Sequence, residues 1–123
     1  MKNKNLSESF RHALRGLRRT AANERNFKIH ISIGLAAVVC CIILRIETAL
    51  FIWVAFSIFS VLALELVNTS VEALADLFCG GKPHPLAKVA KDAAAAAVLL
   101  AAVQAVAVAA VVAATVVSRW LNS

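Results

Sequence analysis

The chain has 123 residues, of which 61% are hydrophobic and only 16% are charged. A soluble domain is about 45–50% apolar and about a quarter charged, so this composition excludes an ordinary soluble domain and indicates a membrane protein. The formal net charge of +6 comes entirely from residues 1–28, where eight Lys and Arg face two Glu. A basic segment beside such apolar sequence does not fit a nucleic-acid-binding domain, so we expect no nucleic-acid partner.

Residues 1–26 are predicted to form an amphipathic surface helix. Apolar residues recur there at three- and four-residue spacing, and arginines occupy the other side. The apolar positions are Phe10, Ala13, Leu14, Leu17 and Ala21, and the basic ones are Arg11, Arg15, Arg18 and Arg19. Such a helix is expected to lie in the membrane interface with its arginines against anionic head groups, and the alternative is a disordered basic tail.

Three long apolar stretches without charged residues follow this helix. A membrane-spanning helix needs about 20 residues, so we predict transmembrane helices over residues 27–46, 48–76 and 88–119. A tight turn at residues 45–47 joins the first two, and a Gly- and Pro-containing loop at residues 79–85 joins the second and third. The predicted fold class is an all-α membrane protein of one domain, with a surface helix and three transmembrane helices.

The distribution of Lys and Arg predicts how this fold is oriented. Cytoplasmic segments of membrane proteins carry an excess of these residues. The basic N-terminal segment and the loop region with Lys82, Lys88 and Lys91 are therefore expected on the cytoplasmic side, and the 45–47 turn on the other side.

Four polar residues at the end of the second predicted span share one helical face. Glu65, Asn68, Glu72 and Asp76 are separated by three, four and four residues, which places them on one side of a helix. Glu65 directly follows the charge-free run and so lies near the edge of the hydrocarbon, where ionisable residues usually mark function. Four further charged residues are expected at the same depth, the cytoplasmic interface of the membrane. Three of them precede the third span and one precedes the first: Lys88, Lys91, Asp92 and Glu24.

This set of side chains favours phosphoryl transfer. Carboxylate and amide oxygens suit a hard cation such as Mg²⁺, which also binds substrate phosphates. Lysines suit the phosphate charges, and a carboxylate at the hydrocarbon edge can accept a proton from a lipid hydroxyl. The pattern therefore predicts transfer of a phosphoryl group from a nucleotide to a lipid head group.

Two other interpretations stay open at this point. Intramembrane carboxylates also form cation paths in small transporters, although the middles of all three spans are uncharged here. The alternative function is thus a non-enzymatic small membrane transporter or assembly subunit. The charged residues at the helix ends also fit solvated salt bridges, which explains Glu65 and Asn68 poorly. The segment Gly80–Pro83 lacks the spacing and the Ser or Thr of a Walker A loop.

Two sequence runs carry a resemblance to a known family. The segment from Glu65 to Asp76, with its E-x-x-N-x-x-x-E pattern, and the segment from His84 to Asp92, with its A-K-D end, resemble the prokaryotic diacylglycerol kinase family. The segment from Asn23 to His30 also matches. The resemblance covers nearly the whole chain and implies a small bacterial enzyme of the cytoplasmic (inner) membrane that transfers the γ-phosphate of ATP directly to a lipid hydroxyl.

The resemblance also implies roles for individual residues. Glu65 is expected to be the catalytic base, with Asn68 as its hydrogen-bonding neighbour. Glu24 and Glu72 are expected to hold Mg²⁺ with ATP. Further nucleotide-binding residues are then His84, Lys91 and Asp92, with Asp76 and Lys88 in supporting positions near the substrates. A homotrimer with active sites shared between subunits is expected as well.

The resemblance leaves two lipid substrates. The segments Arg25–His30 and His84–Lys88 are similar to a branch common in Gram-positive bacteria, whose members often phosphorylate undecaprenol. The other branch phosphorylates diacylglycerol. The expected role is accordingly lipid recycling or cell-envelope precursor metabolism, and undecaprenol is the favoured substrate.

Overall fold

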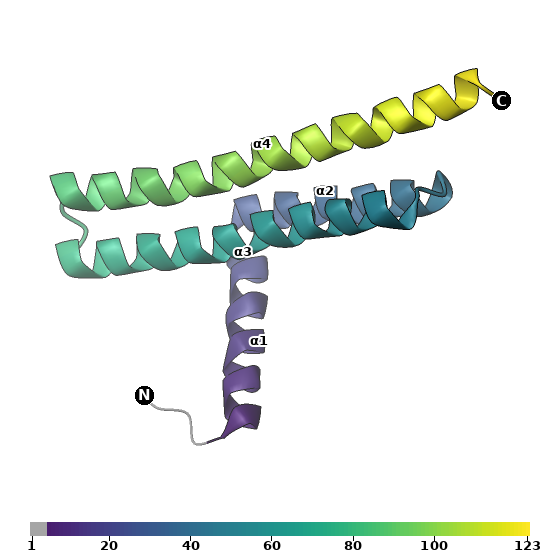
Figure 1. Cartoon of the computed structure of the whole chain (residues 1–123). Helices are drawn as coiled ribbons and strands as arrows, with labels where there is room; N and C mark the ends of the chain where they lie inside the picture. Colours follow the sequence, from purple (N-terminus) through teal and green to yellow (C-terminus); the bar gives the residue numbers. More distant parts are fainter. Residues whose placement is uncertain (1–4) are drawn as a thin grey trace.

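The structure, a computed structural model, describes residues 5–123 and contains four α-helices joined by short turns (Figure 1). These are α1 (Leu6–Asn23), α2 (Arg25–Ile43), α3 (Thr48–Cys79) and α4 (Pro85–Leu121). Helices α2, α3 and α4 are long and apolar enough to cross a membrane. The predicted fold class, a surface helix followed by three membrane helices, is confirmed. Residues 1–4 of the predicted surface helix lie outside the described part of the chain.

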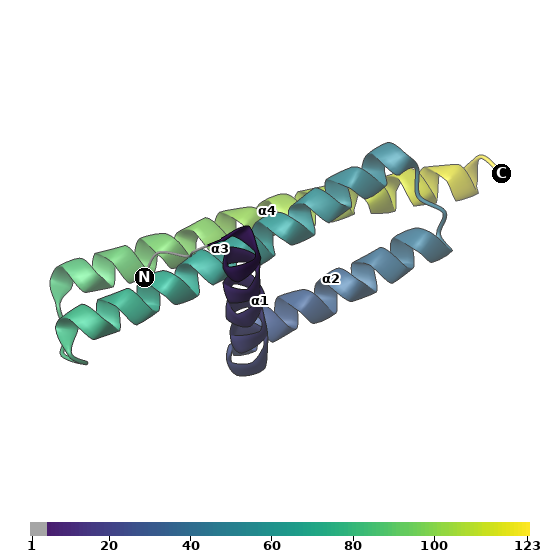
Figure 2. The ribbon, with the colours of Figure 1, turned by 90° about the horizontal axis from the view of Figure 1, so that it is seen from below.

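Helix α1 is oriented crosswise to the other three helices and extends away from them, starting at the beginning of α2 (Figures 1 and 2). The Asn5 side chain caps its start by accepting a hydrogen bond from the backbone N–H of Glu8 at 2.9 Å. Its end is set by Glu24, which has extended backbone angles and is followed at once by the first residue of α2. A single residue therefore separates the surface helix from the first span.

The turn between α2 and α3 is held by a residue from α4. Helix α2 ends at Ile43, and Arg45 adopts a left-handed conformation with φ of 49°. The guanidinium of Arg119 donates hydrogen bonds to the carbonyl oxygens of Leu44 at 2.5 Å and Arg45 at 3.3 Å. Carbonyls at the end of a helix lack partners within the helix, so this contact satisfies two of them and ties α4 to the turn.

The loop between α3 and α4 is shorter than expected from sequence. Helix α3 continues three residues beyond Asp76 to Cys79 and is capped by Gly80, whose φ of 55° is the left-handed conformation typical of a helix C-terminus. Helix α4 begins at Pro85, because proline fits the first turn of a helix, where its missing N–H has no partner to lose. The charged residues between 88 and 92 therefore lie in the first turns of α4, so the helix backbone fixes their relative positions.

Helix α3 lies between α2 and α4 and packs against both. Val54 and Val61 of α3 and Val98, Ala101 and Val116 of α4 are buried along these interfaces. The approach of α2 to α3 is closest at Gly34, where an added Cβ would lie 2.9 Å from Cγ2 of Ile58. Across the other interface, the Gln104 amide donates to the Ser57 hydroxyl at 3.0 Å, and that hydroxyl donates to the Trp53 carbonyl at 2.8 Å.

Candidate active site

Helices α3 and α4 extend well past the start of α2, so that their joined ends stand beyond the level of α1 (Figure 1). We call residues 65–92 the charged end; it begins at Glu65, which lies beside His30 of α2, and includes the joined ends of α3 and α4. It contains Glu65, Asn68, Glu72 and Asp76 on α3 and Lys88, Lys91 and Asp92 on α4, together with the intervening loop. Seven predicted site residues thus occupy two adjacent antiparallel helices.

Glu65 is buried, with 6% of its surface exposed. Its Oε1 lies 3.1 Å from Nε2 of His30 on α2, and the two side chains are 7% and 25% exposed. An unpaired buried carboxylate is costly, so this contact compensates part of the loss of water around Glu65. The sequence analysis assigned His30 no site role. The available signal was an imidazole inside an apolar run, six residues after Glu24.

Asn68 lies one turn beyond Glu65 and is also buried. Its amide nitrogen donates a hydrogen bond to Oε1 of Glu72 at 3.2 Å. Its carbonyl oxygen Oδ1 is buried and has no partner among the described residues. Buried polar atoms are nearly always paired, so this oxygen marks a place for a donor or a cation that a single chain does not supply.

The donor chemistry around Asn68 fits Mg²⁺, which takes oxygen ligands and keeps several waters or substrate phosphates. Glu72 and the free Oδ1 of Asn68 offer such oxygens on one face of α3. Residues 5–123 of one chain nevertheless contain no group of three or more His, Cys, Asp or Glu placed to hold a metal ion. The assignment of Glu24 and Glu72 as metal ligands therefore stays a prediction.

The end of the bundle beyond Asn68 carries two ion pairs. Nζ of Lys91 lies 2.9 Å from Oδ1 of Asp76, and Lys88 pairs with Asp92 one turn along α4. Lys91 precedes the charge-free part of α4, and the carboxylate of Asp76 holds its ammonium group at this end of the bundle. Lys91 therefore carries a positive charge that suits phosphate oxygens.

A hollow at the loop brings five of the predicted residues together. Asp76, His84, Lys88, Lys91 and Asp92 all line it. Nδ1 of His84 accepts a hydrogen bond from the backbone N–H of Leu86 at 3.2 Å, so His84 caps the start of α4. This capping contact is a structural role that the sequence analysis did not assign to His84. The hollow combines three lysines, including Lys82, with two carboxylates, an arrangement suited to the phosphates and hydroxyls of a nucleotide.

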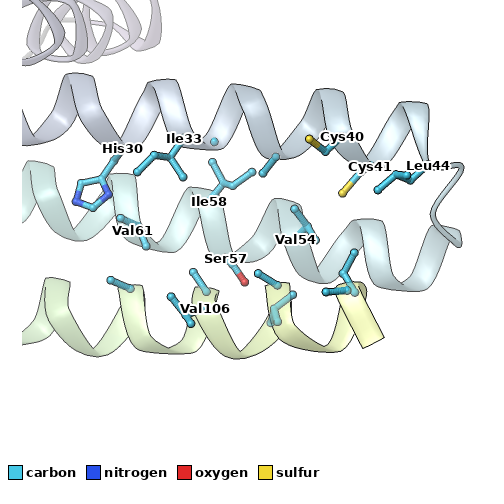
Figure 3. A pocket seen from close by; sticks show the side chains of 18 of the residues that line it. His30, Ile33, Cys40, Cys41, Leu44, Val54, Ser57, Ile58, Val61 and Val106 are labelled. Carbon is cyan, nitrogen blue, oxygen red and sulfur yellow. The ribbon is translucent and has the colours of Figure 1, made fainter. Parts of the chain in front are cut away.

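An apolar groove of about 550 Å³ begins beside His30 and runs along the bundle (Figure 3). Its walls come from α2 and α4, which do not pack directly against each other, and its floor comes from α3. Figure 3 shows His30 at one end and Cys40, Cys41 and Leu44 towards the other. The lining of this groove is almost wholly apolar, and His30 at its end contacts the buried carboxylate of Glu65, which does not itself line the groove. This arrangement suits a molecule with a polar head and a long apolar chain.

Comparisons with known proteins agree with this interpretation. The family described as "Prokaryotic diacylglycerol kinase" matches residues 11–113. The chain is similar to a diacylglycerol kinase of Synechocystis sp., with 44% identity over 97 residues, which covers 79% of this chain and 55% of the relative. It is also similar to an undecaprenol kinase of Bacillus subtilis, with 42% identity over 91 residues, or 74% of this chain and 73% of the relative. The chain thus spans about half the length of the Synechocystis protein.

Proposed function

Because the chain belongs to the prokaryotic diacylglycerol kinase family, we propose that it is a lipid kinase that transfers the γ-phosphate of ATP directly to a lipid hydroxyl. The observation that carries the proposal is the buried carboxylate of Glu65, which contacts His30 at the end of the apolar groove and lies on the same helix face as Asn68 and Glu72. The transfer takes place at the cytoplasmic face of the bacterial inner membrane, where ATP is available.

In this mechanism Glu65 is the general base. One of its oxygens accepts the proton of the lipid hydroxyl while the hydroxyl oxygen forms its bond to the γ-phosphorus. The bond from that phosphorus to the β–γ bridging oxygen breaks, and ADP leaves with the bonding electron pair. Burial of Glu65 keeps water away from the carboxylate, which favours the lipid hydroxyl as the acceptor over hydrolysis of ATP.

The charged end binds and orients the nucleotide. Lys91 contacts the phosphates, while Asp92 contacts the sugar and His84 lies nearby in the loop. Lys88 and Asp76 hold their partners Asp92 and Lys91 in place. Mg²⁺, when bound with ATP, neutralises phosphate charge, and Glu24 and Glu72 are the residues that would hold it. In a homotrimer with shared sites, a second copy completes the set of ligands.

Undecaprenol is the favoured lipid substrate, and diacylglycerol is the second candidate. The two relatives carry these two names, so they support both. The segments Arg25–His30 and His84–Lys88 favour the undecaprenol branch. The product then serves cell-envelope precursor metabolism, whereas phosphorylated diacylglycerol serves lipid recycling.

The test uses the purified full-length protein in detergent micelles with labelled ATP, Mg²⁺ and either undecaprenol or diacylglycerol. We expect a labelled lipid product, and its loss on chelation of Mg²⁺. E65Q is expected to abolish transfer while leaving helical content unchanged. E47Q is the matched control, because Glu47 lies in the turn at the other end of the bundle and is expected to leave activity intact. A wild-type protein that phosphorylates neither lipid, or a fully active E65Q variant, would contradict the proposal.

The same preparation separates the kinase from the alternative function of a transporter or assembly subunit. The alternative predicts an activity that does not need ATP and that tolerates K91A. The kinase proposal predicts that K91A weakens ATP binding, visible as a raised KM for ATP.

A further inference from the structure

His30 provides the only polar contact to Glu65 among the described residues. The two residues come from different helices, and the 3.1 Å separation of Nε2 and Oε1 is within hydrogen-bonding range. A carboxylate that acts as a base gains from a neighbouring group that fixes its orientation, in the same way that a third residue orients the base of a catalytic triad.

The surroundings of His30 hold the imidazole in this position. Gly34 lies one turn further along the same face of α2, and its missing Cβ allows α2 to approach Ile58 of α3 closely. Both His30 and Gly34 line the apolar groove. A lipid chain in this groove would place its hydroxyl end near the imidazole, whose Nε2 contacts Glu65.

We propose that His30 is a positioning residue for Glu65, and this inference rests on the proposed role of Glu65 as the base. In this role Nε2 of His30 contacts Oε1 of Glu65. This contact stabilises the ionised carboxylate and directs the other oxygen, Oε2, towards the lipid hydroxyl. His30 itself does not contact the transferred phosphoryl group.

The experiment compares variants that differ in the reach of one N–H donor. In H30Q the side-chain amide nitrogen is as many bonds from Cβ as Nε2 of histidine, so it can still reach Glu65. In H30N the amide is one carbon shorter and falls short, and H30L removes the donor. S32A serves as the control, because Ser32 is exposed on α2 and its hydroxyl bonds only to its own helix at the Lys28 carbonyl.

The measured quantities are kcat and KM for MgATP and for undecaprenol or diacylglycerol in micelles. Hydrogen bonds to charged groups are worth about 1.5–3 kcal/mol, so kcat should fall by roughly 10- to 100-fold in H30N and H30L. H30Q should recover most of the wild-type kcat, and the KM for ATP should not change in any variant. Circular dichroism checks folding. If H30L does not fold, the comparison of H30Q with H30N still tests the positioning role of His30.

Each outcome separates this inference from the proposed function. Wild-type kcat in H30N, or equal losses in H30Q and H30N, would overturn the positioning role while the kinase activity stands. A wild-type protein that phosphorylates neither lipid would overturn the proposed function, and the role of His30 would fall with it.

Discussion

Replacement of Gly34 by alanine tests the close approach of α2 and α3. The new Cβ would lie 2.9 Å from Cγ2 of Ile58 and 3.6 and 3.7 Å from its Cγ1 and Cδ1. Carbon atoms pack best at about 3.5–4.0 Å, so one of the two helices or the Ile58 side chain must move by roughly half an ångström or more. Cγ2 is attached directly to Cβ of isoleucine, whose χ1 rotation is restricted, so a simple side-chain rotation does not relieve the overlap with the new Cβ.

The expected cost follows from two opposing terms. Overpacking of a helix interface costs about 1–3 kcal/mol. Alanine is preferred over glycine within a helix by about 0.8–1.0 kcal/mol. The free energy of unfolding of G34A should therefore fall by about 1 kcal/mol. Its activity should fall as well, because His30 lies one turn before Gly34 on the same face and retreats from Glu65 when α2 shifts.

The stability is measured from the midpoint of unfolding by dodecyl sulfate in mixed micelles, followed by tryptophan fluorescence. G16A is the control, because a Cβ on Gly16 of α1 meets no atom within 4 Å and should cost nothing. In an I58A background the penalty of G34A should vanish, whereas in an I58V background it should persist, because valine keeps both carbons attached to Cβ, including the position of Cγ2. An unchanged midpoint for G34A, or the same penalty in both backgrounds, would refute this reasoning.

Three further predictions address polar contacts. Q104L removes the hydrogen bond between α4 and α3 and should lower the free energy of unfolding by about 0.6–1 kcal/mol in the same dodecyl sulfate assay, and a loss several times larger would show a wider network. R119Q removes the guanidinium that donates hydrogen bonds to the carbonyls of Leu44 and Arg45, so backbone amides of the α2–α3 turn should exchange hydrogen faster. Unchanged exchange would contradict a stabilising role of these hydrogen bonds. D76N removes the carboxylate that holds the Lys91 side chain, so Lys91 should become more accessible. Acylation of Lys91 at one fixed pH, followed by mass spectrometry, should then be faster than in the wild type, with the other lysines as internal controls, and equal rates would contradict that assignment.

Local sequence patterns predicted the helices because helix formation depends on neighbouring residues. The charge-free runs and the Gly and Pro residues at 80–85 indicated three apolar helices and their connections. The three- and four-residue spacing from Glu65 to Asp76 indicated one helical face, and those residues lie along α3. The ends of the helices were less predictable, because backbone angles at Glu24, Arg45 and Gly80 decide them.

Contacts between helices could not be predicted in the same way. The pairs His30–Glu65, Ser57–Gln104 and Arg119–Leu44 depend on how far one helix is displaced and rotated against the next. That register is set by packing of many side chains, and a spacing pattern within one helix carries no information about it. The capping contact of His84 is local, but residue type alone does not separate a capping histidine from a ligand-binding one.

Helix α2 is held at both ends, by the crosswise α1 at one end and by the Arg119 contact with the turn at the other. Its 19 residues span about 28 Å at 1.5 Å per residue, close to the hydrocarbon thickness of a typical bilayer. A bilayer of another thickness must therefore tilt α2 against α3, since a helix does not stretch. Tilting displaces His30 from Glu65, so the rate of phosphorylation should peak at one acyl-chain length in a series of phosphatidylcholine bilayers, and a flat profile would contradict it. The length of the first span would thus couple membrane thickness to the contact between His30 and Glu65, the proposed base.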